Sequence, residues 1–343
     1  MRWLALLMLV LLGACARPQP VGVTELTYAT PYSPGHPFSR ADQRWIEFVE
    51  KQSGGSLKIR PIWSGALLSA DMSMEELRHG VADIGLITPI YVRGGTHLIR
   101  LQSGFYSGAD SVESQVELYN CLDAADPEIG HELEGLKILA VQGGALPGII
   151  TRGKRVKTLD DLRGMRLRAP TELLTVLDSL GADPVNMPMG EVYSSLAKGV
   201  LDGVIAPPDT FQALHFAEVS QYYNNLAIPR GAYPARAMGM EVWKRLNKKQ
   251  RAVLEEGKSV WEEALAEEIR AASQRGLNDA HQAGIVFSDM SEADQKRFDE
   301  LYLRDARNNA RSLERFGIDG MKAFDIARTS VVARDTIRCG GIS

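Results

Sequence analysis

In the first part of the chain, segments with the hydrophobic pattern of a strand take turns with segments in which apolar residues recur every three or four positions. This pattern predicts strands separated by helices. Strands are expected at 25–29 and 57–62, and a mainly apolar run predicts a buried strand at 82–87. Between them, apolar residues every three or four positions predict helices at 39–52 and 73–79. Strands that alternate with helices are typical of a parallel sheet in an α/β protein.

The same alternation returns in the middle of the chain, and the end of the chain is helical. Long helical patterns cover 242–287 and 291–316, and such helices can strap two α/β lobes together. The middle segment is expected to contribute the strands 137–141, 165–168, 184–187 and 204–206, with helices at 171–180 and 191–198.

The first 14 residues have the build of a secretory signal. Arg2 is followed by an apolar run over 4–12, which is too short to span a bilayer. The sequence Leu-Gly-Ala-Cys that ends at Cys15 resembles a bacterial lipobox, so we expect lipidation of Cys15 and a short tether over 15–23. The alternative is ordinary signal cleavage, with Cys15 incidental. Either outcome places the mature chain outside the cytoplasm, in the periplasm.

Composition excludes several classes of protein. The 343 residues suggest about two domains, and 39 basic against 43 acidic residues give a net charge of −4. We therefore expect no nucleic-acid partner. The G-x-S-x-G, Walker, H-E-x-x-H and G-x-G-x-x-G motifs are missing and the six histidines are scattered. The expectation is a monomer that is not an enzyme and uses no cofactor or metal.

Two cysteines remain besides the one in the lipobox. Cys121 and Cys339 could pair in an oxidising compartment, but the sequence does not show their distance. A buried free thiol at Cys121 is the alternative.

Arg168 is the strongest candidate for binding chemistry. It stands at the carboxyl end of a predicted strand, directly before Ala169, Pro170 and a helix that Thr171 is expected to cap. Ligands of open α/β sheets bind at such strand ends, and a guanidinium offers a rigid fork for a carboxylate. An anion clamp is one interpretation, and a surface arginine paired with a nearby acid is the other.

Residues 157–203 carry a resemblance to a known family. The segments DLRGMRLRAP, LGADPV, MPMGEVYSSL and GVLDG occur in this order, and HGVADIGL stands at 79–86. This pattern resembles the DctP-type solute-binding proteins of TRAP (tripartite ATP-independent periplasmic) transporters. The resemblance implies the periplasmic binding protein fold, which has two α/β lobes, hinge strands and a long helix spanning both.

The same resemblance implies a function. The lobes would close around a small organic acid, and Arg168 would pair with its carboxylate. The loaded protein would dock on a permease with a small and a large membrane subunit, which uses an ion gradient. We expect 24–146 plus 232–275 to form the first lobe, and 147–231 plus 276–343 the second. A sensory receptor of the same architecture is one alternative, and an enzyme that uses the cleft is another.

The pocket departs from the family pattern at three positions. Ile205 and Ala206 stand where a typical member has Glu and Asn, and Met189 replaces a common aromatic residue. These changes predict a less polar pocket and a monocarboxylate ligand with an apolar or aromatic body. Other arginines could compensate for the missing polar groups, namely Arg93, Arg230 and Arg236.

Further candidates stand where strand ends should face the cleft. Their aromatic and polar side chains suit an organic acid, although loop packing is the alternative for each. They are Tyr32, His36, Trp63, Thr88, Tyr91 and Tyr233.

Overall fold

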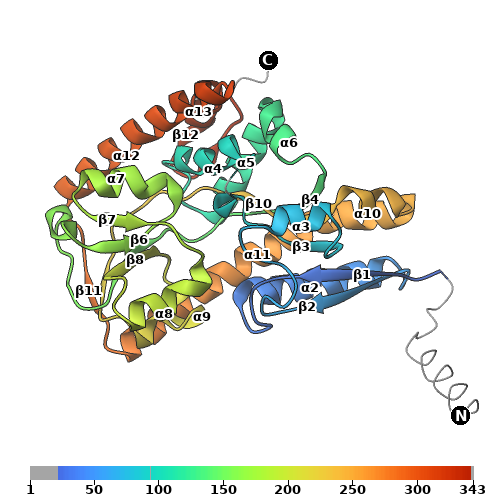
Figure 1. Cartoon of the computed structure of the whole chain (residues 1–343), viewed down its shortest axis with the longest axis horizontal. Coiled ribbons are helices and arrows are strands. Elements are labelled where there is room, and N and C mark those ends of the chain that lie inside the picture. The colour runs from blue at the N-terminus through green and yellow to red at the C-terminus, as the bar shows by residue number, and fades with distance from the viewer. Residues whose placement is uncertain (1–21, 93, 341–343) are drawn as a thin grey trace, which may run out of the picture.

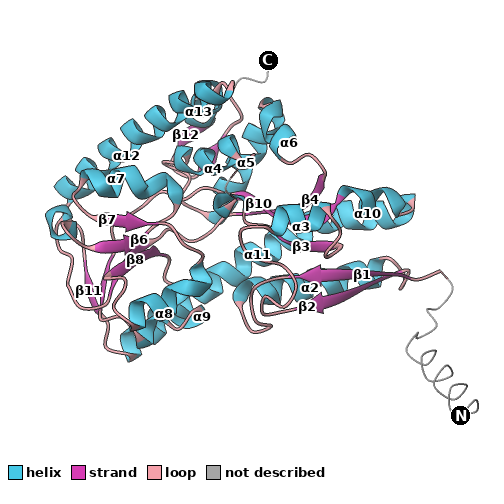
Figure 2. Cartoon of the chain, viewed as in Figure 1, coloured by secondary structure: helices cyan, strands magenta, loops and turns pink. Residues whose placement is uncertain are grey.

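A computed structural model describes residues 22–92 and 94–340, which form two large sheets flanked by helices and one two-stranded sheet (Figure 2). The first lobe is built on a five-stranded sheet of order β2-β1-β3-β10-β4. Its strands are β1 (Thr24–Ala29), β2 (Leu57–Ile62), β3 (Ile84–Leu86), β4 (Leu136–Gln142) and β10 (Tyr233–Gly239). β1 is parallel to β2 and β3, whereas β10 is antiparallel to β3 and β4. The chain therefore returns to this sheet at β10 after it has built β5 to β9 of the second sheet, and adds β11 to the second sheet later.

Helices cover the first sheet as the periodicity predicts. The helix α2 buries Trp45, Ile46 and Val49 against the sheet, and the ring nitrogen of His36 caps its first turn. The helices are α2 (Pro37–Gln52), α3 (Ser73–Arg78), α4 (His97–Gln102), α5 (Val112–Ala125) and α6 (Pro127–Glu132).

The second lobe is built on a six-stranded sheet of order β11-β9-β5-β8-β6-β7. Its strands are β5 (Gly148–Thr151), β6 (Arg166–Arg168), β7 (Asp183–Val185), β8 (Gly203–Ala206), β9 (Tyr222–Asn224) and β11 (Val286–Ser288). Its short helices are α7 (Leu174–Ser179), α8 (Val192–Ala197) and α9 (Thr210–Ala213). The expected cap at Thr171 is wrong, because this residue opens the 3₁₀ turn η4 (Thr171–Leu173) and its side chain caps nothing.

One long helix spans the two lobes (Figure 1). α11 (Lys248–Gln282) has 35 residues, so it is about 50 Å long, and it packs on α2 and β4 at one end and on α9 at the other. The helical pattern over 242–287 forms two helices and a short strand. Asn247 and Gln250 form a capping box that separates α10 (Met240–Arg245) from α11, and the last residues form β11.

The C-terminal segment ends against the first lobe. α12 (Glu292–Ser312) begins on the second lobe, and the tail then packs its apolar side chains into the first-lobe core around α5. The tail consists of α13 (Gly320–Ser330), β12 (Val331–Ala333) and β13 (Thr336–Ile337). A disulfide between Cys121 and Cys339 joins it to α5 and resolves the open pairing question. This part of 276–343 thus differs from its expected place in the second lobe.

The two-lobed α/β architecture with a long spanning helix is confirmed. The exact lobe boundaries stay a prediction. The signal segment 1–14, Cys15 and most of the tether lie outside the described residues. None of the helices in the described part of the chain is long and apolar enough to cross a membrane.

Candidate functional site

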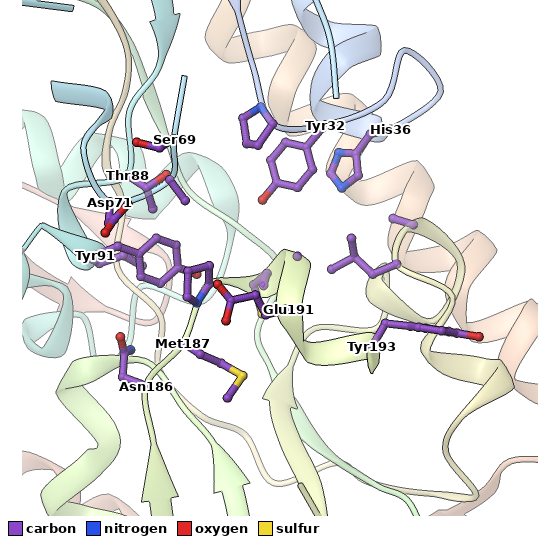
Figure 3. A pocket seen from close by; sticks show the side chains of 18 of the residues that line it. Tyr32, His36, Ser69, Asp71, Thr88, Tyr91, Asn186, Met187, Glu191 and Tyr193 are labelled. Carbon is purple, nitrogen blue, oxygen red and sulfur yellow. The ribbon is translucent and has the colours of Figure 1, made fainter. Parts of the chain in front are cut away.

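A cavity of about 130 Å³ lies between the lobes, and it adjoins an open groove of about 1130 Å³. Tyr32, His36 and Tyr91 line both hollows from the first lobe. Figure 3 shows these side chains across the groove from Met187 and Glu191 of the second lobe. The hollow is therefore built from loops that follow strands of both sheets, as is common for ligand sites in α/β proteins.

Arg168 is held at the wall of the cavity by two hydrogen bonds. It is the last residue of β6, it is 4% exposed, and Pro170 follows at the end of the strand. Its Nε donates to the carbonyl oxygen of Met187 at 3.0 Å, and Nη2 donates to the hydroxyl of Tyr91 at 2.8 Å. A guanidinium has five N–H groups, so the remaining ones are available for a carboxylate.

Three tyrosines of the first lobe face the same cavity. Tyr91 ends the 3₁₀ turn η1 (Pro89–Tyr91), and Tyr233 begins β10, where its hydroxyl accepts from Gln142 at 3.3 Å. Burial raises the pKa of Tyr32 and Tyr233 above the ordinary value, so both phenols stay protonated. The site therefore offers neutral hydroxyls beside the arginine.

His36 combines a structural and a lining role. Its Nδ1 accepts from the backbone N–H of Phe38 at 3.2 Å, and its ring stacks on Tyr32 with centroids 4.0 Å apart. Burial lowers its pKa to about 3, and the charges of Arg236 and Arg40 add to this shift. The imidazole is therefore neutral and carries its proton on Nε2.

Most of the predicted residues meet at this cavity. Thr88 is buried beside Tyr91, and Met189 enters from the 3₁₀ turn η5 (Met189–Glu191). The predicted residues that line the cavity are Tyr32, His36, Thr88, Tyr91, Arg168, Met189, Arg230 and Tyr233.

Two predicted lining residues lie elsewhere, and the geometry of a strand explains the second of them. Trp63 packs edge-to-face on Tyr28 with centroids 5.9 Å apart, and it lines neither hollow. Ala206 is buried opposite Gly148 in the sheet, whereas its neighbour Ile205 lines the cavity. Successive side chains of a strand point to opposite faces, so only one of this pair can reach the ligand space.

Of the three compensating arginines, only Arg230 lines the cavity, while Arg93 lies outside the described residues. Arg236 is fully buried in the first lobe, where its Nε lies 2.8 Å from Asp42. Asp42 also accepts from Tyr28 at 2.5 Å and from Trp261 at 2.9 Å. Arg236 therefore stabilises the joint between α2, β10 and α11 and does not face the cleft.

Two acidic residues of the cavity were not predicted from the sequence. Glu172 lies in η4, four residues after Arg168, and Asp209 lies between β8 and α9. Burial raises the pKa of Asp209 to about 6, although the charge of Arg230 opposes the shift. Burial also raises the pKa of Glu172. The cavity is therefore more polar than the substitutions at Ile205 and Met189 suggest. The position of Glu172 just beyond a strand end was the available signal.

The remaining wall is apolar, so the site can bind and orient an organic anion. The apolar lining residues include Phe38, Ile90, Leu173, Met189, Ile205 and Leu214. Within the described ranges, no cluster of three His, Cys, Asp or Glu residues could hold a metal ion.

The fold and cavity define a two-lobed binding protein, and comparison with known proteins identifies its family. Residues 28–311 match the bacterial extracellular solute-binding proteins, family 7 (DctP), and the chain belongs to this family. A solute-binding protein of Chromohalobacter salexigens is 24% identical over an alignment of 297 residues that covers 79% of this chain and 81% of that protein.

Solved structures share the fold. A marine metagenome TRAP solute-binding protein specific for aromatic acid ligands, in complex with metahydroxyphenylacetate, has a TM-score of 0.82 and 21% identity, covering 91% of this chain and 100% of that chain. A TRAP periplasmic solute-binding protein of Chromohalobacter salexigens with bound D-glucuronate has a TM-score of 0.76 and 16% identity, covering 88% of this chain and 99% of that chain.

Proposed function

We propose that this protein is an extracytoplasmic receptor that captures a small organic acid between its lobes. The main support for this proposal is Arg168, whose buried guanidinium lies at the cavity wall. It has N–H groups that make no hydrogen bond to the protein, and among the described residues it has no ion-pair partner. A ligand carboxylate would supply the missing charge. A ligand that contacts both lobes at once binds the closed form more tightly than the open form. This difference in affinity shifts the equilibrium between the two forms toward closure.

The ligand we favour is a monocarboxylate with an apolar or aromatic body. The apolar wall around Phe38, Leu173 and Ile205 supports this choice. The volume of about 130 Å³ is similar to the ~150 Å³ of a cavity that holds benzene, so it suits a single ring. The metagenome relative specific for aromatic acid ligands supports an aromatic ring, and the relative with D-glucuronate makes a sugar acid the class to test against it.

The family and the N-terminal sequence support the rest of the proposal. The loaded receptor would deliver its ligand to the small and large membrane subunits of a TRAP permease for import driven by an ion gradient. The apolar run before Cys15 supports export to the periplasm and a lipid anchor at this residue. We expect the receptor to act as a monomer and to return its ligand chemically unchanged.

A thermal-shift screen over organic acids tests the proposal. The panel holds aryl and alkyl monocarboxylates, uronates and dicarboxylates. A ligand at about 100 times its Kd adds about 2.7 kcal/mol to the free energy of unfolding, which shifts Tm by several degrees. We expect the strongest shift from an aryl or alkyl monocarboxylate.

Two outcomes of the same screen would contradict the proposal. Equal stabilisation by a dicarboxylate would contradict the monocarboxylate assignment, and no shift with any acid would contradict the proposed function. NMR spectra of the ligand after prolonged incubation should show no product, and any turnover would favour an enzyme.

A further inference from the structure

Two carboxyl groups line a cavity whose arginines are suited to an anion. Asp209 is 6% exposed and Glu172 is 8% exposed. Oδ1 of Asp209 and Oε2 of Glu172 accept no hydrogen bond from any described residue. Buried polar atoms in native proteins nearly always have a partner, so each unpaired oxygen calls for an explanation. A ligand that donates to these oxygens would supply one.

The cavity arginines act on these carboxyls without pairing to them. The charge of Arg230 lowers the pKa of both acids, against the larger effect of burial, and that of Arg168 lowers the pKa of Glu172. No ion pair joins these four side chains in the part of the chain that the structure describes; instead Arg230 points Nη1 toward the carbonyl oxygen of Ala145 at 3.4 Å. The charges are close enough to interact and far enough apart to leave room for ligand atoms.

The two acids differ in their protein surroundings. Glu172 has two protein donors close by: the hydroxyl of Tyr302, which is itself unpaired, and the side chain of Ser103, whose hydrogen bond lowers the pKa of Glu172. For Asp209 no side-chain hydrogen bond contributes to the pKa, which only the charge of Arg230 and its own backbone N–H lower. Asp209 is therefore the stronger candidate for contact with a ligand.

We propose that Asp209, together with Glu172, forms a second subsite that accepts hydrogen bonds from hydroxyl groups of the ligand. This inference rests on the proposed function, because Arg168 must hold the carboxylate. The ligand is then a hydroxylated carboxylic acid, with a donor placed away from its carboxylate. A neutral hydroxyl suits the subsite better than an ammonium group does, because Arg230 already places a positive charge beside both acids.

Calorimetric titration of matched acids tests the subsite. The probes are benzoate, its three hydroxy isomers, its 3-methoxy and 3-aminomethyl derivatives, and D-glucuronate. The protein is compared with Asp209→Asn and Glu172→Gln, which keep the side-chain shape. Asp178→Asn is the matched control, because Asp178 is an exposed acid on α7 of the same lobe.

We expect at least one hydroxylated acid to bind about ten- to hundredfold more tightly than its parent without the hydroxyl, the range for a hydrogen bond to a charged group. For a sugar acid the corresponding result is a loss of D-glucuronate affinity in the variants. Asp209→Asn should remove most of the preference, so the ratio of the Kd of benzoate to that of the hydroxylated acid should fall toward one. Glu172→Gln should reduce it less, and Asp178→Asn should not change it.

Several results would overturn the inference. Arg168-dependent binding of acids with no gain from any hydroxyl rejects the subsite and leaves the proposed function intact. The same holds if the hydroxyl preference persists in both variants, or if the aminomethyl probe binds more tightly than the hydroxylated ones. If no acid binds at all, the proposed function and this inference fail together.

Discussion

Replacing Arg168 by methionine should remove most of the affinity for the ligand carboxylate. The substitution keeps an unbranched side chain of similar reach but removes the charge and every N–H donor. Arg168 is buried and donates one N–H to Met187 and one to Tyr91, which leaves three N–H groups for a ligand. A buried charge pair broken on one side costs on the order of 2–5 kcal/mol, so the Kd should rise about 30- to 5000-fold.

Two further variants sharpen the measurement. Arg168→Lys keeps the charge but loses the planar fork, so we expect an intermediate loss of about tenfold or more. Arg166→Met is the matched control, because Arg166 stands two positions earlier on the same strand and is exposed. Calorimetric titration measures the Kd, and urea unfolding verifies that each variant is folded. An affinity of Arg168→Met within threefold of the parent protein would refute the carboxylate clamp.

Three other predictions concern stability and are measured by urea unfolding. Reducing the Cys121–Cys339 disulfide, which closes a loop of 218 residues, should lower the free energy of unfolding by about 2–5 kcal/mol, and a double serine variant should show no effect of reductant; equal midpoints in all samples would contradict this. The folded-state pKa of Asp209, about 6, lies above its ordinary value of 3.8. The protonated carboxyl therefore adds to the free energy of unfolding; this contribution is complete below pH 3.8 and is lost as the pH rises through 6. Between pH 4 and pH 8, the free energy of unfolding of Asp209→Asn should therefore rise by about 3 kcal/mol relative to that of the parent protein. Parallel curves of unfolding free energy against pH for the two proteins would argue against the raised pKa. Asp42→Asn, which breaks a fully buried ion pair, should lower the free energy of unfolding by about 3–5 kcal/mol. Arg44→Met, which breaks an exposed ion pair, should lower it by less than about 1 kcal/mol. Similar losses in the two variants would show that burial does not decide the size of the effect.

Local patterns predicted the elements that position Arg168. The strand predicted over 165–168 depends on neighbouring residues, and it appears as β6, with Pro170 just beyond its end. The strands β5 and β9 were not predicted, and both pair with strands that are remote in the sequence. β10 was missed because Pro229 to Arg236 has the composition of a loop, and its pairing partners are remote in the sequence.

The residues that meet in the cavity were harder to predict, because they come from segments far apart. Tyr91 and Arg168 are 77 positions apart, and their hydrogen bond depends on how the lobes are joined. Arg236 shows the opposite outcome, since a charged residue expected near the cleft is neutralised inside the core by Asp42, 194 positions away. No local pattern predicts such a pairing.

The sequence by itself determined the alternation of strands and helices, the α/β class and the arginine at a strand end, because each depends on residues within a few turns of one another. The tertiary structure decided which side of β8 faces the ligand, where Arg236 finds its partner, and that Asp209 and Glu172 lie buried beside Arg168 and Arg230. Burial and charge balance depend on the packing of both lobes, and so they arise only when the whole chain is folded.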